Sequence, residues 1–365
     1  MTKAELDNRK ILPLEDSWYR RVKEKLDGIA KPLDGLGKFE HLIAQIGAIE
    51  KTTKISIQKK AVLVMCADNG VVEEQVSQSG KEVTLAVAKA MGVNNSSVGK
   101  MAAVAGVDVI PVDIGIDTDE VIPGVLPRKV AKGTKNFAKE PAMTEEEVLK
   151  AIETGIQLVQ QCHREGYEIL ATGEMGIGNT TTSTAVAAAL LDLEVEQVTG
   201  KGAGLTDEAL KRKCRVIEEA IEKYSLRDAD AFTILKTVGG LDIAGLTGVF
   251  IGAAIEQIPV VIDGVISAVA ALLAETLCKG AVNYMIPSHK SRELAETAIM
   301  KKLHLDPVLD ADMALGEGTG AVMMMSLLDV ALGVYLQGAS FANFEIEQYK
   351  RYEAVSYTHL TLPTI

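Results

Sequence analysis

The sequence predicts an α/β protein in which helices cover both faces of a parallel sheet. Two observations lead to this fold class. Short, continuous apolar segments recur along the chain and end at glycine or polar residues, at 61–67, 107–114, 167–171, 259–262 and 282–286. Alanine-rich helical segments lie between them, as at 82–91, 181–191, 242–255 and 265–278. Strands that are buried on both faces and alternate with helices are typical of parallel α/β sheets.

The two ends of the chain have different patterns. Apolar residues recur at helical spacing over 18–26 and 39–46, and Pro32 separates the two runs, so we expect two amphipathic helices before the sheet begins. Residues 345–353 are charged and resemble a helix. Residues 355–365 (VSYTHLTLPTI) have no helical period, and we interpret them as a disordered or non-native extension, with an edge strand as the alternative.

Composition and charge disfavour several classes of protein. The 365 residues carry a net charge of −12, which disfavours general binding to nucleic acid phosphates. The two long apolar stretches, Val260–Leu277 and Gly320–Leu336, contain acidic residues and lack basic flanking loops, so we expect them to be buried in the protein and not in a membrane. The first ten residues are polar and charged, without the apolar core of a signal peptide. We therefore expect a cytoplasmic protein.

Neither a metal site nor a hydrolytic triad is expected. The four cysteines form no CxxC pair and are interpreted as reduced and buried: Cys66, Cys162, Cys214 and Cys278. His289 is the only histidine near a predicted ligand-binding edge, and it has no second His or Cys at the spacing of metal ligands. The sequence also lacks the Gly-x-Ser-x-Gly elbow of α/β hydrolases.

Ligands of parallel α/β sheets bind beyond the carboxyl ends of the strands, so the residues after each strand are the candidates for chemistry. Gly173–Thr182 (GEMGIGNTTT) includes such a loop. Its glycines let the backbone approach an anion, and the free amides of the following helix attract one. A tight turn capped by threonine explains the same residues equally well. The loop lacks the Gly-Lys-Ser/Thr end of a P-loop and does not match the dinucleotide-binding fingerprint.

Two further glycine-rich loops stand out. Gly200–Gly204 (GKGAG) precedes a helix on which Lys213 can offer a point charge to a phosphate, although basic residues on helices are more often simply solvated. Gly316–Gly320 (GEGTG) places Glu317 among glycines and between apolar segments. Partial desolvation raises the pKa of a carboxyl, which suits a general base. An ordinary loop glutamate is the alternative.

Acidic and polar residues follow the other predicted strands, at Asp68, Asp113, Asp263 and Ser288–Ser291. Carboxylates at these positions can bind ribose hydroxyls or stabilise a cationic sugar in a transition state. They can equally serve as helix N-caps.

In their order along the chain, these loops resemble those of one family. The motifs are KPLDGLGKFE (31–40), GEMGIGNTTT (173–182), GKGAGL (200–205), VGGLDI (238–243), PVVIDGVIS (259–267), SHKS (288–291) and LGEGTGA (315–321). They closely resemble the nicotinate-nucleotide–dimethylbenzimidazole phosphoribosyltransferase family of cobamide (vitamin B12) biosynthesis. The likeness extends from about Trp18 to Phe344, and GEMGIGNTTT and GEGTGA together are its specific signature.

The resemblance implies a Rossmann-like α/β fold with a small helical domain formed from both termini. The expected small domain comprises residues 1–60 and 338–354, and the expected catalytic domain comprises residues 61–337. A homodimer without metal or cofactor is also implied. The implied reaction moves ribose 5-phosphate from nicotinate mononucleotide to 5,6-dimethylbenzimidazole or a related base, with inversion to the α-ribotide and release of nicotinate.

The resemblance also assigns roles to single residues by matching motif. Glu317 is the expected general base, which removes the azole proton. The expected nucleotide-binding residues are Glu174, Gly176, Gly178, Asn179, Thr180, Gly202, Lys213, Asp263 and Ser291. The expected base-binding residues are Asp68, Ser79, Gly80, Met175 and Leu315.

The sequence departs from the family pattern around the base-binding segment. The usual Asp-His-Gly is Asp68-Asn69-Gly70 here, the usual Ser-(Ala/Pro)-(Tyr/Phe)-Pro is Ser77-Gln78-Ser79-Gly80, and a common Gly-Ser-Leu-Gly is Asp34-Gly35-Leu36-Gly37. The loss of an aromatic residue and a proline predicts a roomier or more polar base pocket. Such a pocket would accept substituted benzimidazoles, and purines or phenols as well.

Two other functions stay open at this point. One is a nucleotide-dependent dehydrogenase or kinase on the same architecture, which the absent fingerprints disfavour but the fold class alone does not exclude. The other is a non-catalytic subunit that binds the base or the nucleotide. Release of nicotinate by the purified protein would separate an enzyme from a binding subunit.

Overall fold

The computed structural model describes residues 1–202 and 204–351. Within them, six parallel strands form a sheet in the order β3-β2-β1-β4-β5-β6. The strands are β1 (Lys60–Ala67), β2 (Val107–Gly115), β3 (Leu126–Pro127), β4 (Ile169–Met175), β5 (Val260–Ile262) and β6 (Met285–Pro287). The predicted α/β class with a parallel sheet is confirmed. The expected tail at 355–365 lies outside the described residues.

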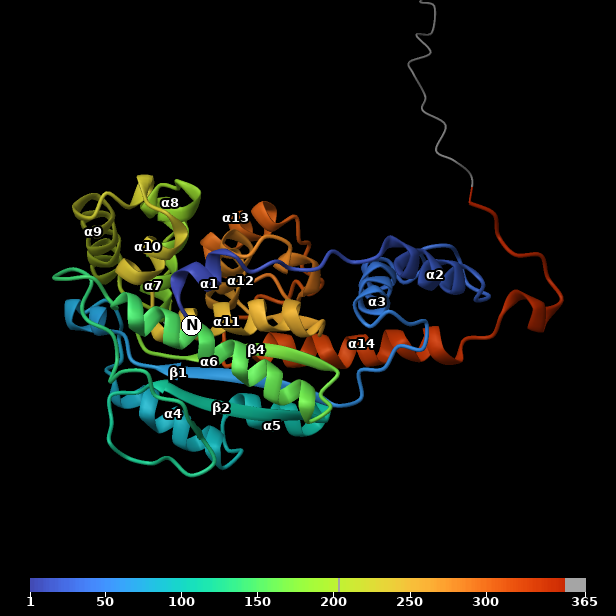
Figure 1. The fold of residues 1–365 in the computed structure, drawn as a ribbon, viewed down its shortest axis with the longest axis horizontal. Helices are drawn as coiled ribbons and strands as arrows, with labels where there is room; N and C mark the ends of the chain where they lie inside the picture. Colours follow the sequence, from blue (N-terminus) through green and yellow to red (C-terminus); the bar gives the residue numbers. More distant parts are fainter. Residues whose placement is uncertain (203, 352–365) are drawn as a thin grey trace, which may run out of the picture.

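Helices cover both faces of this sheet (Figure 1). Because successive side chains of a strand point to opposite faces, the apolar run of β1 supplies two cores. Leu63 and Met65 pack in one core with α6 (Glu145–Arg164), α11 (Leu241–Glu256) and α12 (Val265–Leu277). Val62 and Val64 pack in the other with α5 (Ser97–Ala105) and α14 (Thr319–Gln337). This arrangement explains why the strands are continuously apolar.

The remaining elements connect these layers or extend from them. The other α-helices are α1 (Lys3–Asp7), α2 (Asp16–Asp27), α3 (Lys38–Ile49), α4 (Glu82–Gly92), α7 (Asn179–Leu191), α8 (Val195–Val198), α9 (Asp207–Lys223), α10 (Ala231–Val238) and α13 (Leu294–Leu303). Short 3₁₀ turns are η1 (Gly70–Glu74), η2 (Leu226–Asp228), η3 (Ala281–Tyr284) and η4 (Phe341–Phe344).

Two element predictions were wrong in part. Residues 282–284 lie in η3, and the strand begins only at Met285. Gly280 adopts φ +98°, and the Glu275 carboxylate accepts hydrogen bonds from the amides of Gly280 and Val282, which fixes a turn before the strand. The expected helix at 345–353 is absent from its described part, residues 345–351, because Glu345 turns into the left-handed region and ends η4.

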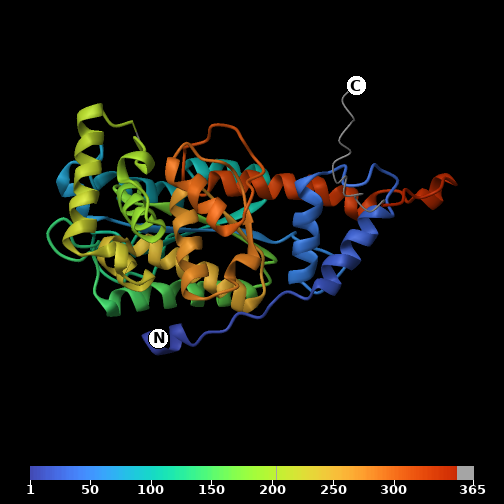
Figure 2. The same ribbon diagram turned by 90° about the horizontal axis from the view of Figure 1, so that it is seen from above.

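α14 extends beyond the sheet toward α2 and α3, as both views show (Figures 1 and 2). The Tyr335 hydroxyl donates to the Thr53 carbonyl at 2.9 Å, and Ser340 pairs with Ile29 in an isolated bridge. Residues from the two ends of the chain therefore pack together at this side of the molecule. A boundary between two domains at residues 60 and 337 stays a prediction.

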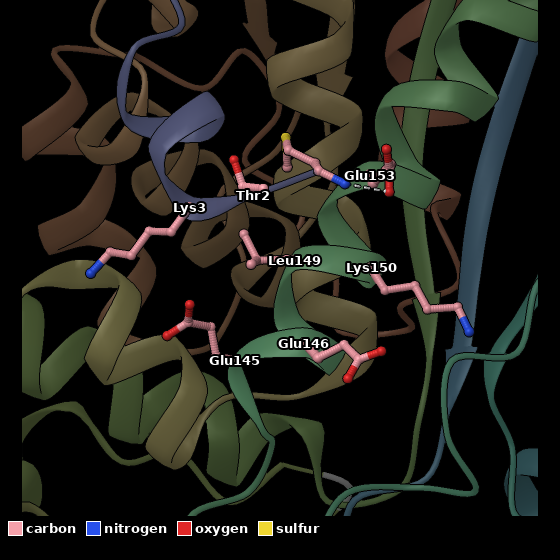
Figure 3. Close-up of a pocket in the computed structure, with 8 residues that line it drawn as sticks. Thr2, Lys3, Glu145, Glu146, Leu149, Lys150 and Glu153 are labelled. Atoms are coloured by element: carbon pink, nitrogen blue, oxygen red, sulfur yellow. Dashed lines mark hydrogen bonds and ion pairs between the residues drawn. The ribbon is translucent and has the colours of Figure 1, made fainter.

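The first residues of the chain lie along α6, on the large body of the molecule. The Met1 amino group forms an ion pair with Glu153 at 2.8 Å, and the buried Leu6 belongs to the same core as α6. Figure 3 shows the shallow, charged hollow between α1 and α6, with Lys3 and Glu145 among its labelled side chains. This hollow contains none of the predicted site residues.

Among the described residues, α14 is long and apolar enough to cross a membrane, judged by length and composition alone. More than half of its apolar stretch is buried in the protein. Val322, Met325 and Leu328 pack in the core on one face of the sheet. The apolar composition of this helix is therefore explained by its burial in the protein core.

Candidate active site

A cavity of about 310 Å³ lies beyond the carboxyl ends of β4, β5 and β6, where the fold class places ligands. It is lined by the loops that follow these strands and by the segment before α14. The lining includes Glu174, Met175, Gly176, Asn179, Thr180, Gly202, Asp263, Ser291, Leu315 and Glu317. Ten of the predicted site residues thus lie around one cavity, although they are far apart in the sequence.

A smaller recess of about 80 Å³ adjoins this cavity and shares part of its wall. Gly178 lines the recess, together with Ser77 and Gln78. The segment that departs from the family pattern therefore reaches the edge of the site through its first two residues.

The Glu317 loop has an unusual backbone. Gly316, Glu317 and Gly318 adopt φ values of +80°, +61° and +90°, a left-handed run that glycines favour. The loop packs tightly on β4, since a Cβ on Gly173 would lie 2.6 Å from the Glu317 carbonyl oxygen. Gly173 and the two flanking glycines therefore let a carboxylate approach the end of a buried strand.

The carboxylate of Glu317 has a specific partner. Its Oε2 accepts a hydrogen bond of 3.0 Å from the Val98 amide, in the first turn of α5. The positive end of a helix favours a negative charge at this place. The contact fixes the direction of the Glu317 carboxylate, and a general base requires a fixed position next to the proton that it removes.

Asp263 holds the same loop through backbone amides at the start of α14. Its carboxylate accepts hydrogen bonds from the amides of Gly318, Gly320 and Ala321 at 3.2, 2.9 and 3.1 Å. These amides belong to the N-terminus of α14, which otherwise lacks a side-chain cap. Asp263 is buried and also lines the cavity. Its main structural effect is to fix α14 and hence the position of Glu317.

Two buried acids lie at the cavity: Glu174 lines it, and Asp242 lies close to Glu174 but outside the lining. Burial, with the negative charge of Asp242 nearby, raises the pKa of Glu174 to about 8, although a hydrogen bond from the Asn179 amide opposes the shift. Burial likewise raises the pKa of Asp242 to about 6. Glu174 is therefore largely protonated at neutral pH and can donate a hydrogen bond into the cavity. Asp242 was not predicted as a site residue, although it lies in the motif VGGLDI (238–243) that contributes to the family resemblance.

Lys213 supplies a buried positive charge next to the glycine loops. Its Nζ donates to the Thr180 hydroxyl at 3.0 Å and to the Gly200 carbonyl at 3.2 Å. The side chain is fully buried, and burial lowers its pKa. Within the described residues it forms no ion pair, whereas buried lysines are almost always paired. This ammonium group is therefore suited to an anionic ligand.

Three predicted base-binding residues do not line the cavity. Asp68 is buried beside the end of β1, where its carboxylate accepts a hydrogen bond from the Asp117 amide at 2.8 Å. Ser79 and Gly80 lie beyond the lining residues Ser77 and Gln78. Their assignment to the base stays a prediction.

Similarity to known proteins is strong over nearly the whole chain. Residues 11–346 match the model of a phosphoribosyltransferase family, DBI_PRT. A protein from Acetivibrio thermocellus, named nicotinate-nucleotide–dimethylbenzimidazole phosphoribosyltransferase, is 45% identical over 329 residues, which cover 90% of this chain and 94% of the relative. A protein of the same name from Clostridium acetobutylicum is 43% identical over 337 residues, which cover 92% and 96%. This chain belongs to the phosphoribosyltransferase family.

Solved structures agree with this family membership. The crystal structure of CobT from Thermus thermophilus superposes with a TM-score of 0.86 at 34% sequence identity, and the match covers 91% of this chain and all of that one. The fold class, the family resemblance and the enzyme class predicted from the sequence are confirmed. The roles of single residues in the cavity stay predictions.

Proposed function

We propose that this enzyme moves ribose 5-phosphate from nicotinate mononucleotide to 5,6-dimethylbenzimidazole or a related base, for assembly of the cobamide nucleotide loop. The names of its relatives supply the substrates. The observation that carries the proposal for this chain is one cavity with two chemically different sides. One lining group is the carboxylate of Glu317. The other lining groups are Thr180, whose hydroxyl accepts a hydrogen bond from the buried ammonium of Lys213, and Gly202, which lies close to that ammonium.

The proposed chemistry uses the two sides for different groups. The phosphate binds near Lys213 and the glycine loops, which leaves C1′ toward Glu317. An azole nitrogen attacks C1′ as the bond between C1′ and the pyridinium nitrogen breaks, and its electron pair returns to nicotinate. Glu317 accepts the azole proton. Because nicotinate leaves from a cationic pyridinium, no acid is needed at the leaving group, and the enzyme acts mainly by positioning.

The carboxyl groups around the cavity support this assignment. Positive charge develops on the ribose as the pyridinium leaves, and nearby carboxylates stabilise such charge. Asp263 and Glu317 line the cavity, and the protonated Glu174 is suited to hydrogen bonding with a ribose oxygen. We assign Gly176, Gly178, Asn179 and Ser291 to nucleotide binding, and Met175 and Leu315 to the base.

The acceptor base is proposed as a class and not as one compound. Ser79 and Gly80 stand where the family pattern has an aromatic residue and a proline, and they directly follow Ser77 and Gln78, which line the recess at the edge of the site. We therefore expect several substituted benzimidazoles to react, and purines or phenols to react detectably. A panel of bases in competition, with products analysed by mass spectrometry, would refute this expectation if only dimethylbenzimidazole reacted.

We also propose that the enzyme is a cytoplasmic homodimer. Val104 on α5 and Val330 on α14 are 90% and 74% exposed, and these two helices pack against each other. Exposed aliphatic side chains on adjoining helices are suited to an interface between copies of the chain. Light scattering of the purified protein would detect the dimer.

The decisive test is Glu317→Gln in the purified protein. We expect kcat to fall by about 10²- to 10⁴-fold, the usual contribution of a general base, while nicotinate mononucleotide still binds. Nicotinate release and α-ribotide formation are measured together by mass spectrometry. The matched control is Glu208→Gln, which removes an exposed carboxylate on α9 and should leave kcat unchanged.

Near-normal turnover in Glu317→Gln would remove this residue from the role of base. Failure of the unaltered enzyme to release nicotinate with any base would reject the transfer reaction and favour a non-catalytic binding subunit.

A further inference from the structure

Glu293 occupies an unusual place for a carboxylate. It is the N-cap residue of α13, yet its side chain makes no hydrogen bond to that helix. Its Oε1 instead accepts a hydrogen bond of 3.2 Å from the Gly202 amide, across the cavity wall. Its Oε2 packs against Gly200, where a Cβ atom would come within 2.0 Å of it. A negative group therefore rests on the second glycine-rich loop.

The groups around this carboxylate are those of an anion site. A Cβ on Gly202 would lie 3.1 Å from the Thr180 hydroxyl and 3.8 Å from the Lys213 ammonium, so amide, hydroxyl and ammonium converge. Burial lowers the pKa of Lys213, and the negative charge of the nearby Glu293 opposes this shift. No carboxylate of the described chain comes within ion-pair distance of Lys213, so the ammonium is only partly compensated.

We propose that the Glu293 carboxylate is an internal occupant of the phosphate subsite, which the phosphate of the nucleotide displaces on binding. This inference rests on the proposed function for the identity of the nucleotide. Two anions on one amide repel each other, so Glu293 must leave the Gly202 amide when a phosphate enters. The side chain lies at the end of the segment that carries Ser291, and it can swing away without disturbing its own helix.

An internal competitor has a measurable consequence. The apparent affinity of a site is reduced by the fraction of molecules in which the site is open. If Glu293 occupies the subsite in about nine-tenths of the molecules, its removal tightens phosphate binding about tenfold. The effect concerns the phosphate alone, because the carboxylate competes only with that group. This competition weakens binding of the nucleotide donor and of the phosphorylated product equally.

The test compares Glu293→Gln and Glu293→Ala with the unaltered full chain and with Glu208→Gln. The glutamine removes the charge and keeps the shape, and the alanine also empties the space. Titration calorimetry with inorganic phosphate should give a Kd about 3- to 10-fold lower for both Glu293 variants and an unchanged Kd for Glu208→Gln. Equal or weaker phosphate binding in both Glu293 variants would overturn the proposal.

Kinetics with two donors provide a second, independent measurement. The KM for nicotinate mononucleotide should fall in the Glu293 variants, whereas the KM for nicotinate riboside, which lacks the phosphate, should stay unchanged. An equal rise in KM for both donors would instead place Glu293 on the ribose and overturn the proposal. If the unaltered enzyme transfers no ribose but the phosphate affinity shifts as expected, the proposed function fails and the role of Glu293 stands.

Discussion

The position of Glu317 depends on a second acid, Asp263. Glu317 contributes the carboxylate, but its loop is held by three hydrogen bonds from backbone amides to Asp263. One side chain thus caps α14 and sets the direction of the adjacent residue. The sequence left Asp263 open between a ribose contact and a helix N-cap, and the structure shows that it caps α14, a helix far away in the chain.

For Asp263→Asn, we expect a loss of about 1–3 kcal/mol in the free energy of unfolding, because one acceptor is replaced by an amide NH₂ that faces backbone N–H groups. We also expect kcat to fall, because Glu317 lies next to the released Gly318. Urea unfolding and steady-state rates measure the two effects. The control is Asp230→Asn at the N-cap of α10, where asparagine caps as well as aspartate and both quantities should stay the same.

An unfolding free energy of Asp263→Asn equal to that of the unaltered enzyme would contradict the capping role. A lower free energy of unfolding with an unchanged kcat would show that Asp263 caps α14 without determining the position of Glu317.

At the scale of elements, the glycines of the site serve close packing rather than flexibility. Gly173 lies on β4, in contact with the Glu317 loop. Because Gly173 has no side chain, the backbone of Glu317 occupies the place that a Cβ atom would need. Gly333 in α14 differs, since a Cβ there would meet no atom of the described residues within 4 Å. The two positions form a matched pair for the same substitution.

We expect Gly173→Ala to lower kcat at least tenfold, because the new methyl group displaces the Glu317 loop from the cavity wall, and a misplaced base costs orders of magnitude in rate. Gly333→Ala should raise the free energy of unfolding by about 0.5–1 kcal/mol and leave kcat unchanged, since alanine is the better helix former. Thermal unfolding and kcat of both variants are measured side by side. Normal turnover in Gly173→Ala would show that the loop does not need this contact.

At the scale of the whole molecule, buried carboxyl groups determine how stability changes with pH. Burial raises the pKa of Glu50 and of Glu174 to about 8, that of Glu296 to about 7 and that of Asp242 to about 6. In the unfolded chain these groups release their protons near pH 4. At pH values between the pKa of these groups in the unfolded chain and their pKa in the folded protein, the folded protein binds more protons. The free energy of unfolding therefore falls as the pH rises.

We therefore expect the melting temperature to decrease steadily from about pH 5 to pH 8, which scanning fluorimetry at constant ionic strength would measure. Glu50→Gln tests whether buried carboxyl groups cause this decrease. Glu50 does not line the cavity, and its substitution should make the melting temperature fall less steeply with pH. A melting temperature that is constant or rises over this range would contradict the argument. An unaltered slope in Glu50→Gln would exclude Glu50 as a contributor.

The fold was largely predictable, because the pattern of short apolar strands and alanine-rich helices reflects burial on both faces of a sheet. Four of the five expected strands lie close to their predicted places, and the fifth was misplaced because a carboxylate contact made its start a turn. The two-residue strand β3 has no pattern of its own, since its pairing depends only on its neighbour β2.

The sequence alone identified the family and most of the residues around the cavity, because its loop motifs specify local backbone shapes and chemical groups. Only the tertiary structure showed which of them meet. Within residues 1–202 and 204–351, Lys213 is buried without an ion-pair partner, Asp263 caps α14, and Asp242 and Glu293 lie next to residues far away in the chain. Burial and the charge of distant neighbours depend on packing, and packing joins segments that no local pattern connects.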